Sequence, residues 1–171
     1  MTVQLVDAFP EARALGEMLR RSHLTVAMAE SCTGGLLGAA LTAVPGASAY
    51  IRGGVIAYAD DVKADHLGVS RHLLATHGAV SAPVAEAMAA GARRRYDADL
   101  GVGITGVAGP DPGGEGKPAG LVFIAVASAA GVESERLERD AGREANRSTA
   151  VHSALRLCRV AAERIAAGEE P

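Results

Sequence analysis

The sequence is poor in aromatic residues and in basic charge, and both shortages exclude classes of function. Aromatic residues make up 3% of the 171 positions, with three Tyr, two Phe and no Trp. A base-stacking surface or a cofactor site lined by rings is therefore not expected. The formal net charge is −3 and the isoelectric point is about 5.9, whereas proteins that bind nucleic acids or anionic membranes normally present a basic face. We therefore expect neither nucleic acid nor a membrane as a partner.

Cysteine and long hydrophobic runs are also scarce. Cys32 and Cys158 are the only cysteines, too few for a disulfide framework, and this predicts a reducing compartment. Residues 1–16 carry acidic side chains early and lack the basic and apolar regions of a secretory signal. No apolar run approaches the roughly 18 residues that a membrane span needs. The expected location is the cytoplasm.

Apolar residues make up 49% of the chain, and their spacing predicts alternating helices and strands. The expected helices cover 10–22, 33–44, 60–67, 82–96 and 144–167, and the expected strands cover 24–29, 53–58, 100–104, 120–128 and 132–138. Gly68 is expected to end one helix and Ser81 to cap the next. The charged run 132–138 is typical of a sheet edge. The pattern predicts one α/β domain over residues 1–171, with helices on both faces of a mixed, mostly parallel sheet.

Ligands bind at the carboxyl ends of the strands in such sheets, and the segment 29–35, Ala-Glu-Ser-Cys-Thr-Gly-Gly, follows a predicted strand and opens a predicted helix. Ser31 would lie near the free N–H groups of the helix N-terminus. That position suits a nucleophile whose attack creates an oxyanion, a phosphate-binding loop without chemistry, or a plain helix cap formed by Ser31 or Thr33. Cys32 is a rival nucleophile, ranked below Ser31 because no His lies close in sequence to activate it.

Lysine is rarer than the basic charge suggests, because 15 of the 17 basic residues are Arg and only Lys63 and Lys117 are Lys. A Lys in such a chain indicates a site where Arg would fail. Arg does not give up its proton in a protein, whereas a Lys removed from water can act as a neutral base. Lys63 follows a predicted strand and lies five residues after Tyr58, which could position or relay a proton. Ser31 and Lys63 could form a Ser–Lys pair; a surface Lys paired with a neighbouring aspartate is the alternative.

The segment 105–120 is a long loop with six Gly and three Pro among its sixteen residues. Loops of this length are usually functional or disordered, and Gly lets backbone N–H groups approach a ligand closely. Thr105 directly follows a predicted buried strand and is better placed for a site than the tip of the loop. Lys117 could contact a phosphate as a point charge, and a merely flexible connection is the alternative.

The segment 142–147 opens the last predicted helix with Arg143 and Arg147 on one helix face. This pair could bind a phosphate or a carboxylate, and a solvated pair beside Glu144 is the alternative. The five histidines show no metal-ligand spacing and are expected at surface or capping positions: His23, His66, His72, His77 and His152.

Taken in order, these motifs resemble those of one family. They are similar to the C-terminal domain of the competence- and damage-inducible protein CinA. The motifs that carry the similarity are AESCTGG at 29–35, the Tyr58–Lys63 pair, TGVAGPDPG at 105–113 with its following KPAG, and the Arg-rich helix start. The similarity covers roughly residues 8–167. It implies a three-layer α/β/α sandwich that assembles as a homo-oligomer. Larger members carry a further N-terminal domain, similar to molybdopterin-binding domains, for which 171 residues leave no room.

The resemblance is to the stand-alone, PncC-type amidohydrolases of this family. It implies hydrolysis of the carboxamide of nicotinamide mononucleotide to nicotinic acid mononucleotide and ammonia, in the pyridine nucleotide cycle. Ser31 then corresponds to the nucleophile, Lys63 to its general base and Tyr58 to an assisting group, while Thr105 would orient the substrate or the oxyanion. Backbone N–H groups of residues 32–35 would hold the oxyanion. The remaining residues that the resemblance places around the substrate are Glu30, Cys32, Thr33, Gly34, Gly35, Gly106, Lys117 and Arg147. No metal or other cofactor is expected.

The sequence departs from the family pattern at two places. Asp60 stands where the family often has Asn, and Ala141 and Gly142 stand where it often has Gly and Asp. An additional acid near Lys63 favours the charged amine and predicts a poorer base at neutral pH. The rival hypothesis is a nucleotide-binding or regulatory domain that does not cleave. Only the amidase needs Lys63 Nζ within reach of Ser31 Oγ.

Overall fold

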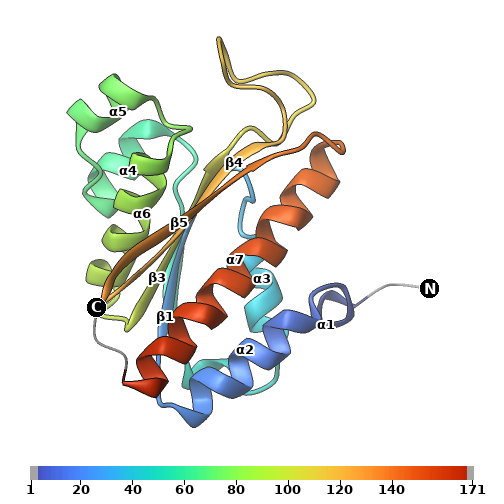
Figure 1. The fold of residues 1–171 in the computed structure, drawn as a ribbon, viewed down its shortest axis with the longest axis vertical. Helices are drawn as coiled ribbons and strands as arrows, with labels where there is room; N and C mark the ends of the chain where they lie inside the picture. Colours follow the sequence, from blue (N-terminus) through green and yellow to red (C-terminus); the bar gives the residue numbers. More distant parts are fainter. Residues whose placement is uncertain (1–3, 169–171) are drawn as a thin grey trace.

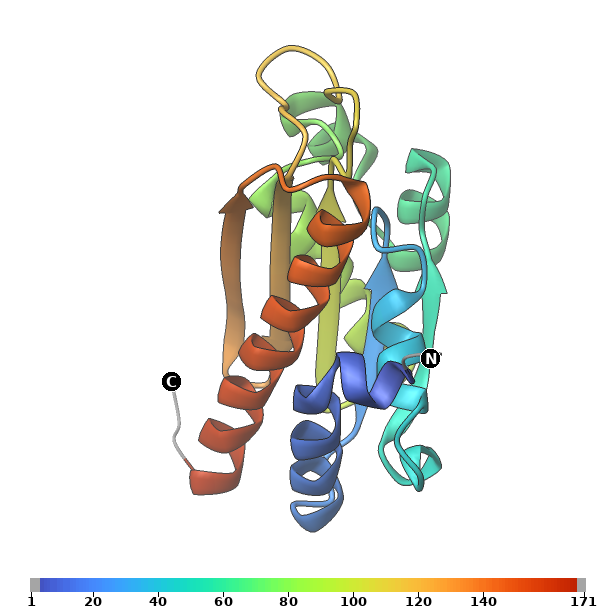
Figure 2. The ribbon, with the colours of Figure 1, turned by 90° about the vertical axis from the view of Figure 1, so that its right-hand side faces the viewer.

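The computed structural model describes residues 4–168 and shows three layers, with a five-stranded sheet between two groups of helices (Figures 1 and 2). The strands are β1 (Val26–Glu30), β2 (Ile51–Ile56), β3 (Leu100–Gly106), β4 (Leu121–Ser128) and β5 (Gly131–Glu138). The helices are α1 (Leu5–Ala8), α2 (Pro10–Arg21), α3 (Leu36–Thr42), the 3₁₀ turn η1 (Ala47–Ala49), α4 (Asp60–Leu67), α5 (Arg71–His77), α6 (Ala82–Arg95) and α7 (Arg143–Ala167).

The sheet has the strand order β2-β1-β3-β4-β5 and is mixed. The strands β2, β1 and β3 are parallel, and β4 and β5 continue the sheet in antiparallel pairings. Glu30, at the end of β1, pairs with Ile56 of β2 on one side and with Ile104 of β3 on the other. The carboxyl ends of the three parallel strands therefore meet at one edge, and the predicted α/β sandwich with a mixed sheet is confirmed.

Helices α2, α3 and α7 cover one face of the sheet, and α4, α5 and α6 cover the other (Figure 2). Successive side chains of β1 point to opposite faces of the sheet and so contribute to the hydrophobic core on each face. Met28 packs under α2, α3 and α7, whereas Ala27 and Ala29 pack under α6. Gly103 of β3 allows α6 to approach closely, because a Cβ there would lie 2.3 Å from the carbonyl oxygen of Ala85.

The predicted boundaries differ from the observed ones where glycine or side-chain bonding intervenes. The helix expected from residue 33 begins at Leu36, because Gly34 and Gly35 have φ angles of +61° and +92° and cannot belong to it. Ser81 does take the expected N-cap position of α6, but its hydroxyl donates to the carbonyl of Gly78 and makes no capping hydrogen bond to the helix. Gly68 does end α4, with φ +69°. The short elements α1, η1 and α5 were not predicted.

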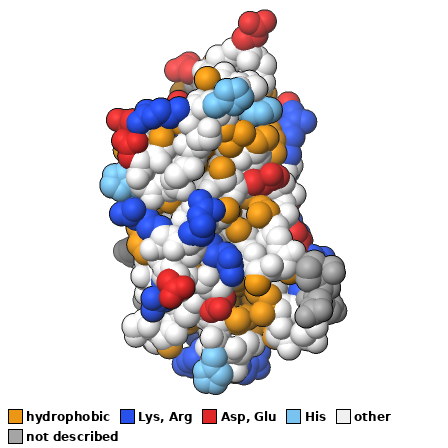
Figure 3. Space-filling model, turned by 90° about the vertical axis from the view of Figure 1, so that its left-hand side faces the viewer, with side chains coloured by type: hydrophobic (Ala, Val, Ile, Leu, Met, Phe, Trp, Pro, Cys, Tyr) orange, Lys and Arg blue, Asp and Glu red, His pale blue; other side chains and the backbone are white. Residues whose placement is uncertain are grey.

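The surface gives no sign of a large basic area on the face that Figure 3 presents, which carries α4, α5 and α6. Small groups of Lys and Arg side chains alternate there with acidic, histidine and apolar side chains (Figure 3). None of the helices in the described range 4–168 is long and apolar enough to cross a membrane.

Candidate active site at the carboxyl edge of the parallel strands

Ser31 opens the turn 31–35, which connects β1 to α3 at the carboxyl edge of the parallel strands. The Ser31 amide continues the sheet by donating to the carbonyl of Ile104 at 2.9 Å. The residue is buried, with 7% of its surface exposed, and within residues 4–168 its hydroxyl makes no hydrogen bond. The sheet therefore fixes the backbone of Ser31 and leaves its oxygen available.

The carboxylate of Glu30 holds the 31–35 turn against the start of α3. It accepts hydrogen bonds from the amides of Gly35 (3.1 Å), Leu37 (3.1 Å) and Gly38 (2.8 Å). Glu30 is 3% exposed, and such charge-assisted bonds are among the stronger ones in proteins. The carboxylate of Glu30 therefore serves the backbone of its own loop, and its contact with a substrate stays a prediction.

The same contacts correct the predicted anion site. The positive end of α3 is already occupied by Glu30, so a phosphate cannot use those amides. The Gly35 amide belongs to this set, and the Gly34 amide donates to the carbonyl of Ser31 at 3.0 Å. Of the four predicted oxyanion donors, only the amides of Cys32 and Thr33 have no oxygen acceptor within the described part of the chain.

Lys63 of α4 is buried, with 1% of its surface exposed, so the alternative of a surface lysine is wrong. Its Nζ donates to the carbonyl of Tyr58 at 2.9 Å and to Oδ1 of Asp60 at 3.4 Å. A lysine amine has three donor positions, so one remains for another partner. Tyr58, two residues beyond the end of β2, is 58% exposed, so its side chain is open to solvent.

Cys32 lies between the charged groups of the site but is not an activated thiol. Burial raises the pKa of Cys32 to about 12, although the nearby charges of Arg147 and Lys63 act in the opposite direction. A thiol with this pKa is protonated at neutral pH and is a weak nucleophile. Because both charges act on this one side chain, Lys63 of α4 and Arg147 of α7 both lie near the 31–35 turn. The structure thus favours Ser31 over Cys32.

Thr105 and Lys117 meet the connection between α5 and α6. The hydroxyl of Thr105 donates to the carbonyl of Ala79 at 2.8 Å, and Nζ of Lys117 donates to the carbonyl of Val80 at 2.6 Å. Lys117, predicted to contact a phosphate, therefore fixes the 107–120 loop to its neighbour. Gly106 has a packing role, since a Cβ there would lie 2.7 Å from the carbonyl oxygen of Leu121.

The first turn of α7 reaches two loops through separate arginines. Nη2 of Arg147 donates to the carbonyl of Thr33 at 2.9 Å, and Nη1 pairs with Glu144 at 3.2 Å. Nη1 of Arg143 donates to the carbonyl of Gly109 at 2.7 Å. The two arginines, predicted to share one anion, thus bind different segments. Arg147 is the one that lies against the 31–35 turn.

One polar residue of this region, Asn146, escaped the sequence analysis. Asn146 is 3% exposed between the two arginines. It is the only asparagine of the chain, and that rarity is the signal that singles it out. Oγ1 of Thr33 is the one buried side-chain oxygen or nitrogen without a partner among residues 4–168.

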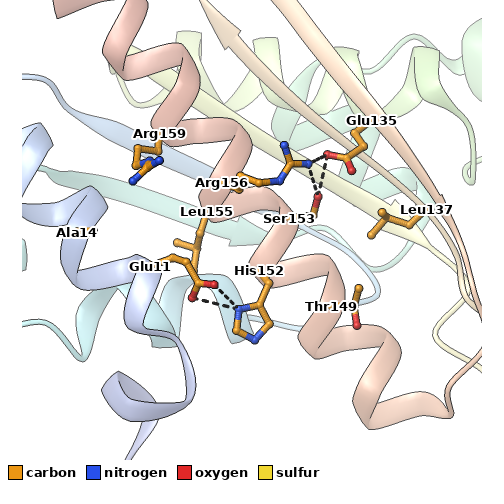
Figure 4. Close-up of a pocket in the computed structure, with 10 residues that line it drawn as sticks. All are labelled: Glu11, Ala14, Glu135, Leu137, Thr149, His152, Ser153, Leu155, Arg156 and Arg159. Atoms are coloured by element: carbon orange, nitrogen blue, oxygen red, sulfur yellow. Dashed lines mark hydrogen bonds and ion pairs between the residues drawn. The ribbon is translucent and has the colours of Figure 1, made fainter.

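A surface cavity with a volume of about 390 Å³ lies elsewhere, between α2, α7 and β5 (Figure 4). Several of its polar side chains pair with one another: Nδ1 of His152 lies 3.1 Å from Glu11, and Ser153 and Arg156 both bind Glu135 (Figure 4). None of the predicted site residues lines it. Residues 4–168 also contain no group of three His, Cys, Asp or Glu side chains that could hold a metal ion.

Comparison with known protein families shows which family this chain belongs to. The model of the CinA C-terminal domain matches residues 9–161. The chain belongs to the CinA C-terminal domain family. It is 46% identical over 142 residues to a putative competence-damage inducible protein of Halothermothrix orenii, covering 82% of this chain and 34% of that protein. A CinA-like protein of Gloeobacter violaceus is 49% identical over 150 residues, covering 86% of this chain and 35% of that protein. The chain thus spans about a third of the length of these curated relatives.

Solved structures of this CinA family have the same fold over nearly their whole length. A CinA superfamily protein of Klebsiella pneumoniae matches with a TM-score of 0.88 at 31% identity, covering 92% of this chain and 98% of that one. The competence/damage inducible protein CihA of Agrobacterium tumefaciens matches with a TM-score of 0.84 at 38% identity, covering 95% and 99%. The family predicted from the motifs is therefore confirmed.

Proposed function

We propose that this CinA-family domain hydrolyses the carboxamide of nicotinamide mononucleotide, giving nicotinic acid mononucleotide and ammonia as a step of pyridine nucleotide recycling. The observation that carries the proposal is Lys63, a buried amine whose Nζ is held at the end of β2 by the carbonyl of Tyr58. A Ser–Lys amidase requires a buried lysine and a serine whose hydroxyl is free, and Lys63 lies close enough to the 31–35 turn that its charge acts on Cys32, the residue after Ser31.

The reaction would proceed in two steps at the 31–35 turn. Lys63, in its neutral form, takes the hydroxyl proton while Oγ of Ser31 attacks the carboxamide carbon. The oxyanion of the tetrahedral intermediate faces the amides of Cys32 and Thr33. Lys63 then gives the proton to the departing nitrogen, the C–N bond breaks, and ammonia leaves an acyl ester on Ser31. Lys63 then takes a proton from water, which attacks the ester carbon; the bond to Oγ of Ser31 breaks, Lys63 returns the proton to this oxygen, and the acid leaves.

Residues around Ser31 and Lys63 would have supporting roles in this reaction. The phenol of Tyr58 assists proton movement from the solvent side, and Thr105 orients the substrate from the end of β3. Arg147 supplies positive charge beside the 31–35 turn, suited to the substrate phosphate. Glu30 supports the reaction indirectly by fixing the loop that carries Ser31.

The competing function is a regulatory domain that binds a nucleotide without cleaving it. Such a domain would be expected to use the α3 N-terminus for the phosphate, and Glu30 already occupies those amides. An assay for ammonia release, run beside calorimetric titration with nicotinamide mononucleotide, separates the two. Ammonia release abolished by Ser31→Ala supports the amidase, whereas nucleotide binding without ammonia release establishes the binding domain.

The family resemblance also leads us to propose a homo-oligomer that acts in the cytoplasm on a small nucleotide, with no nucleic-acid or membrane partner. Light scattering after size-exclusion chromatography tests the assembly. A mass near that of one chain, 17.3 kDa, at micromolar concentration would contradict it.

A further inference from the structure

Asn146 is a buried amide whose hydrogen-bonding groups are used on three different backbone or side-chain partners. Nδ2 donates to the carbonyl of Ala108 at 2.9 Å and to Oδ1 of Asp140 at 3.0 Å. Oδ1 accepts from the amide of Ala141 at 2.9 Å. Only a side-chain amide can donate twice and accept once at this place. An aspartate would set a carboxylate against a carbonyl oxygen and a second carboxylate.

Asp140 itself is an acceptor in this cluster. Hydrogen bonds from Asn146 and from the amide of Gly142 hold the pKa of Asp140 below its ordinary value. The side chain is therefore ionised at neutral pH, and its Oδ1 accepts the hydrogen bond that Nδ2 of Asn146 donates. This contact ties the β5–α7 connection to the first turn of α7, which is a local, structural task.

The contact with Ala108 has a different character, because it joins residues 38 positions apart. Ala108 lies three residues after Thr105, in the segment that leaves the carboxyl end of β3. The next residue of α7, Arg147, holds the carbonyl of Thr33 in the 31–35 turn. One helical turn thus fixes the two segments that flank the proposed site relative to each other.

We propose that Asn146 is a positioning residue for substrate binding, which acts by holding Ala108 and with it the start of the 107–120 loop at a fixed place relative to Ser31. Asn146 touches no substrate in this account. The inference rests on the proposed function, because the loop it positions is taken to line the nucleotide site. Its effect is therefore expected mainly in KM rather than in kcat.

Two variants separate the structural contact from the positioning contact. Asn146→Asp removes both donors and places two carboxylates together, so it lowers the unfolding temperature and raises KM. The exchange variant Asp140→Asn/Asn146→Asp restores one donor and one carboxylate to the pair, with the amide now at position 140. It rebuilds the contact across the β5–α7 connection but cannot donate to Ala108. Ala145→Asp, an added carboxylate on the exposed neighbouring position, is the matched control.

The expected result is that the exchange variant recovers most of the lost unfolding temperature while its KM for nicotinamide mononucleotide stays raised about tenfold, the usual effect of one lost hydrogen bond. Its kcat should change less than KM, and Ala145→Asp should match the parent chain. A KM that returns to the parent value together with the unfolding temperature would overturn the proposal, because the Ala108 contact would then be without effect.

Hydrogen–deuterium exchange gives a readout that does not depend on amidase activity. In the double variant Asp140→Asn/Asn146→Asp, peptides covering residues 107–120 should take up deuterium faster than in the parent chain, while peptides of α7 take it up at the parent rate. If the parent chain releases no ammonia but the double variant shows this faster deuterium uptake, the proposed function fails and the positioning of the loop stands. Deuterium uptake in 107–120 that is the same in the double variant and the parent chain would overturn the positioning role even in an active enzyme.

Discussion

Nζ of Lys63 donates a hydrogen bond to the backbone carbonyl of Tyr58 at 2.9 Å. Because the acceptor is a main-chain group, Lys63 keeps its place whatever side chain stands at position 58. The phenol of Tyr58 is exposed and makes no hydrogen bond within residues 4–168. The backbone and the side chain of this residue can therefore be tested separately.

Tyr58→Phe removes the phenol and leaves the carbonyl that holds Lys63. We expect kcat to fall by about 10- to 100-fold if the phenol assists proton transfer, with an unchanged unfolding temperature because the ring is exposed. Steady-state ammonia release and a thermal melt measure the two effects. An unchanged kcat would remove Tyr58 from the chemistry and leave only its carbonyl with a role.

Glu30→Gln tests whether this carboxylate serves the loop. The amide keeps the shape but offers one acceptor oxygen to three N–H donors, so the free energy of unfolding should fall by about 2 to 3 kcal/mol. Glu11→Gln, at an exposed carboxylate paired with His152, is the control and should cost less than about 1 kcal/mol. Urea denaturation measures both. A Glu30→Gln protein of parent stability with a raised KM would instead place Glu30 in the substrate site.

The two cysteines should be inert in the folded protein. Burial raises the pKa of both Cys32 and Cys158 from 9.0 to about 12, so iodoacetamide at pH 8 should label neither until urea unfolds the chain. Rapid alkylation of Cys32 in the folded state would contradict this and revive it as a nucleophile.

The raised pKa values of the two thiols also predict how the stability of the fold changes at alkaline pH. Above pH 9 the thiols of the unfolded chain lose their protons, while those of the folded chain keep them until about pH 12. The unfolded state is then favoured, so the free energy of unfolding should decrease between these two pH values. Cys158→Ala should make this decrease shallower in a pH series of urea melts.

Two glycines inside helices should respond to alanine with opposite signs. In α3, a Cβ at Gly38 would lie 3.5 Å from Oε1 of Glu30 and from Cε of Met28, an ordinary contact. Gly38→Ala should therefore stabilise the protein by about 0.5 to 1 kcal/mol through helix propensity. In α6, a Cβ at Gly91 would lie 2.1 Å from the carbonyl oxygen of Leu67, so Gly91→Ala should destabilise by about 2 to 3 kcal/mol. Equal signs would contradict the packing of α4 on α6.

The sequence was sufficient for the layers of the fold because its strands and long helices carry clear patterns. The buried strand β3 is a nearly unbroken apolar run, and the edge strand β5 carries four charges in its eight residues. Helix α5 escaped prediction because it has only seven residues, and its two leucines, Leu73 and Leu74, are adjacent and show no helical spacing. The start of α3 was misplaced because two glycines with positive φ precede it.

For the site, the sequence located the segments but not their contacts. Ser31 and Lys63 follow the strands β1 and β2, whereas Thr105, expected after a strand ending at 104, lies within the carboxyl end of β3. Parallel strands gather such residues at one edge of the sheet. Some of these side chains are held by hydrogen bonds to residues far away in the sequence, and this decides whether they can also bind a ligand. Lys117 binds Val80, 37 residues away, and Asn146 binds Ala108, 38 residues away. Such contacts leave no local pattern in the chain.

The central claim is that Lys63 is the base of a Ser–Lys amidase, and ammonia release from nicotinamide mononucleotide by Lys63→Arg tests it most directly. Arg keeps the positive charge but does not give up its proton, so turnover should fall by at least about 100-fold. Lys63→Met, which keeps the buried shape without the amine, should fail equally while remaining folded by circular dichroism. Turnover of Lys63→Arg at the parent rate would contradict the account, because a residue that cannot accept the Ser31 proton would then suffice.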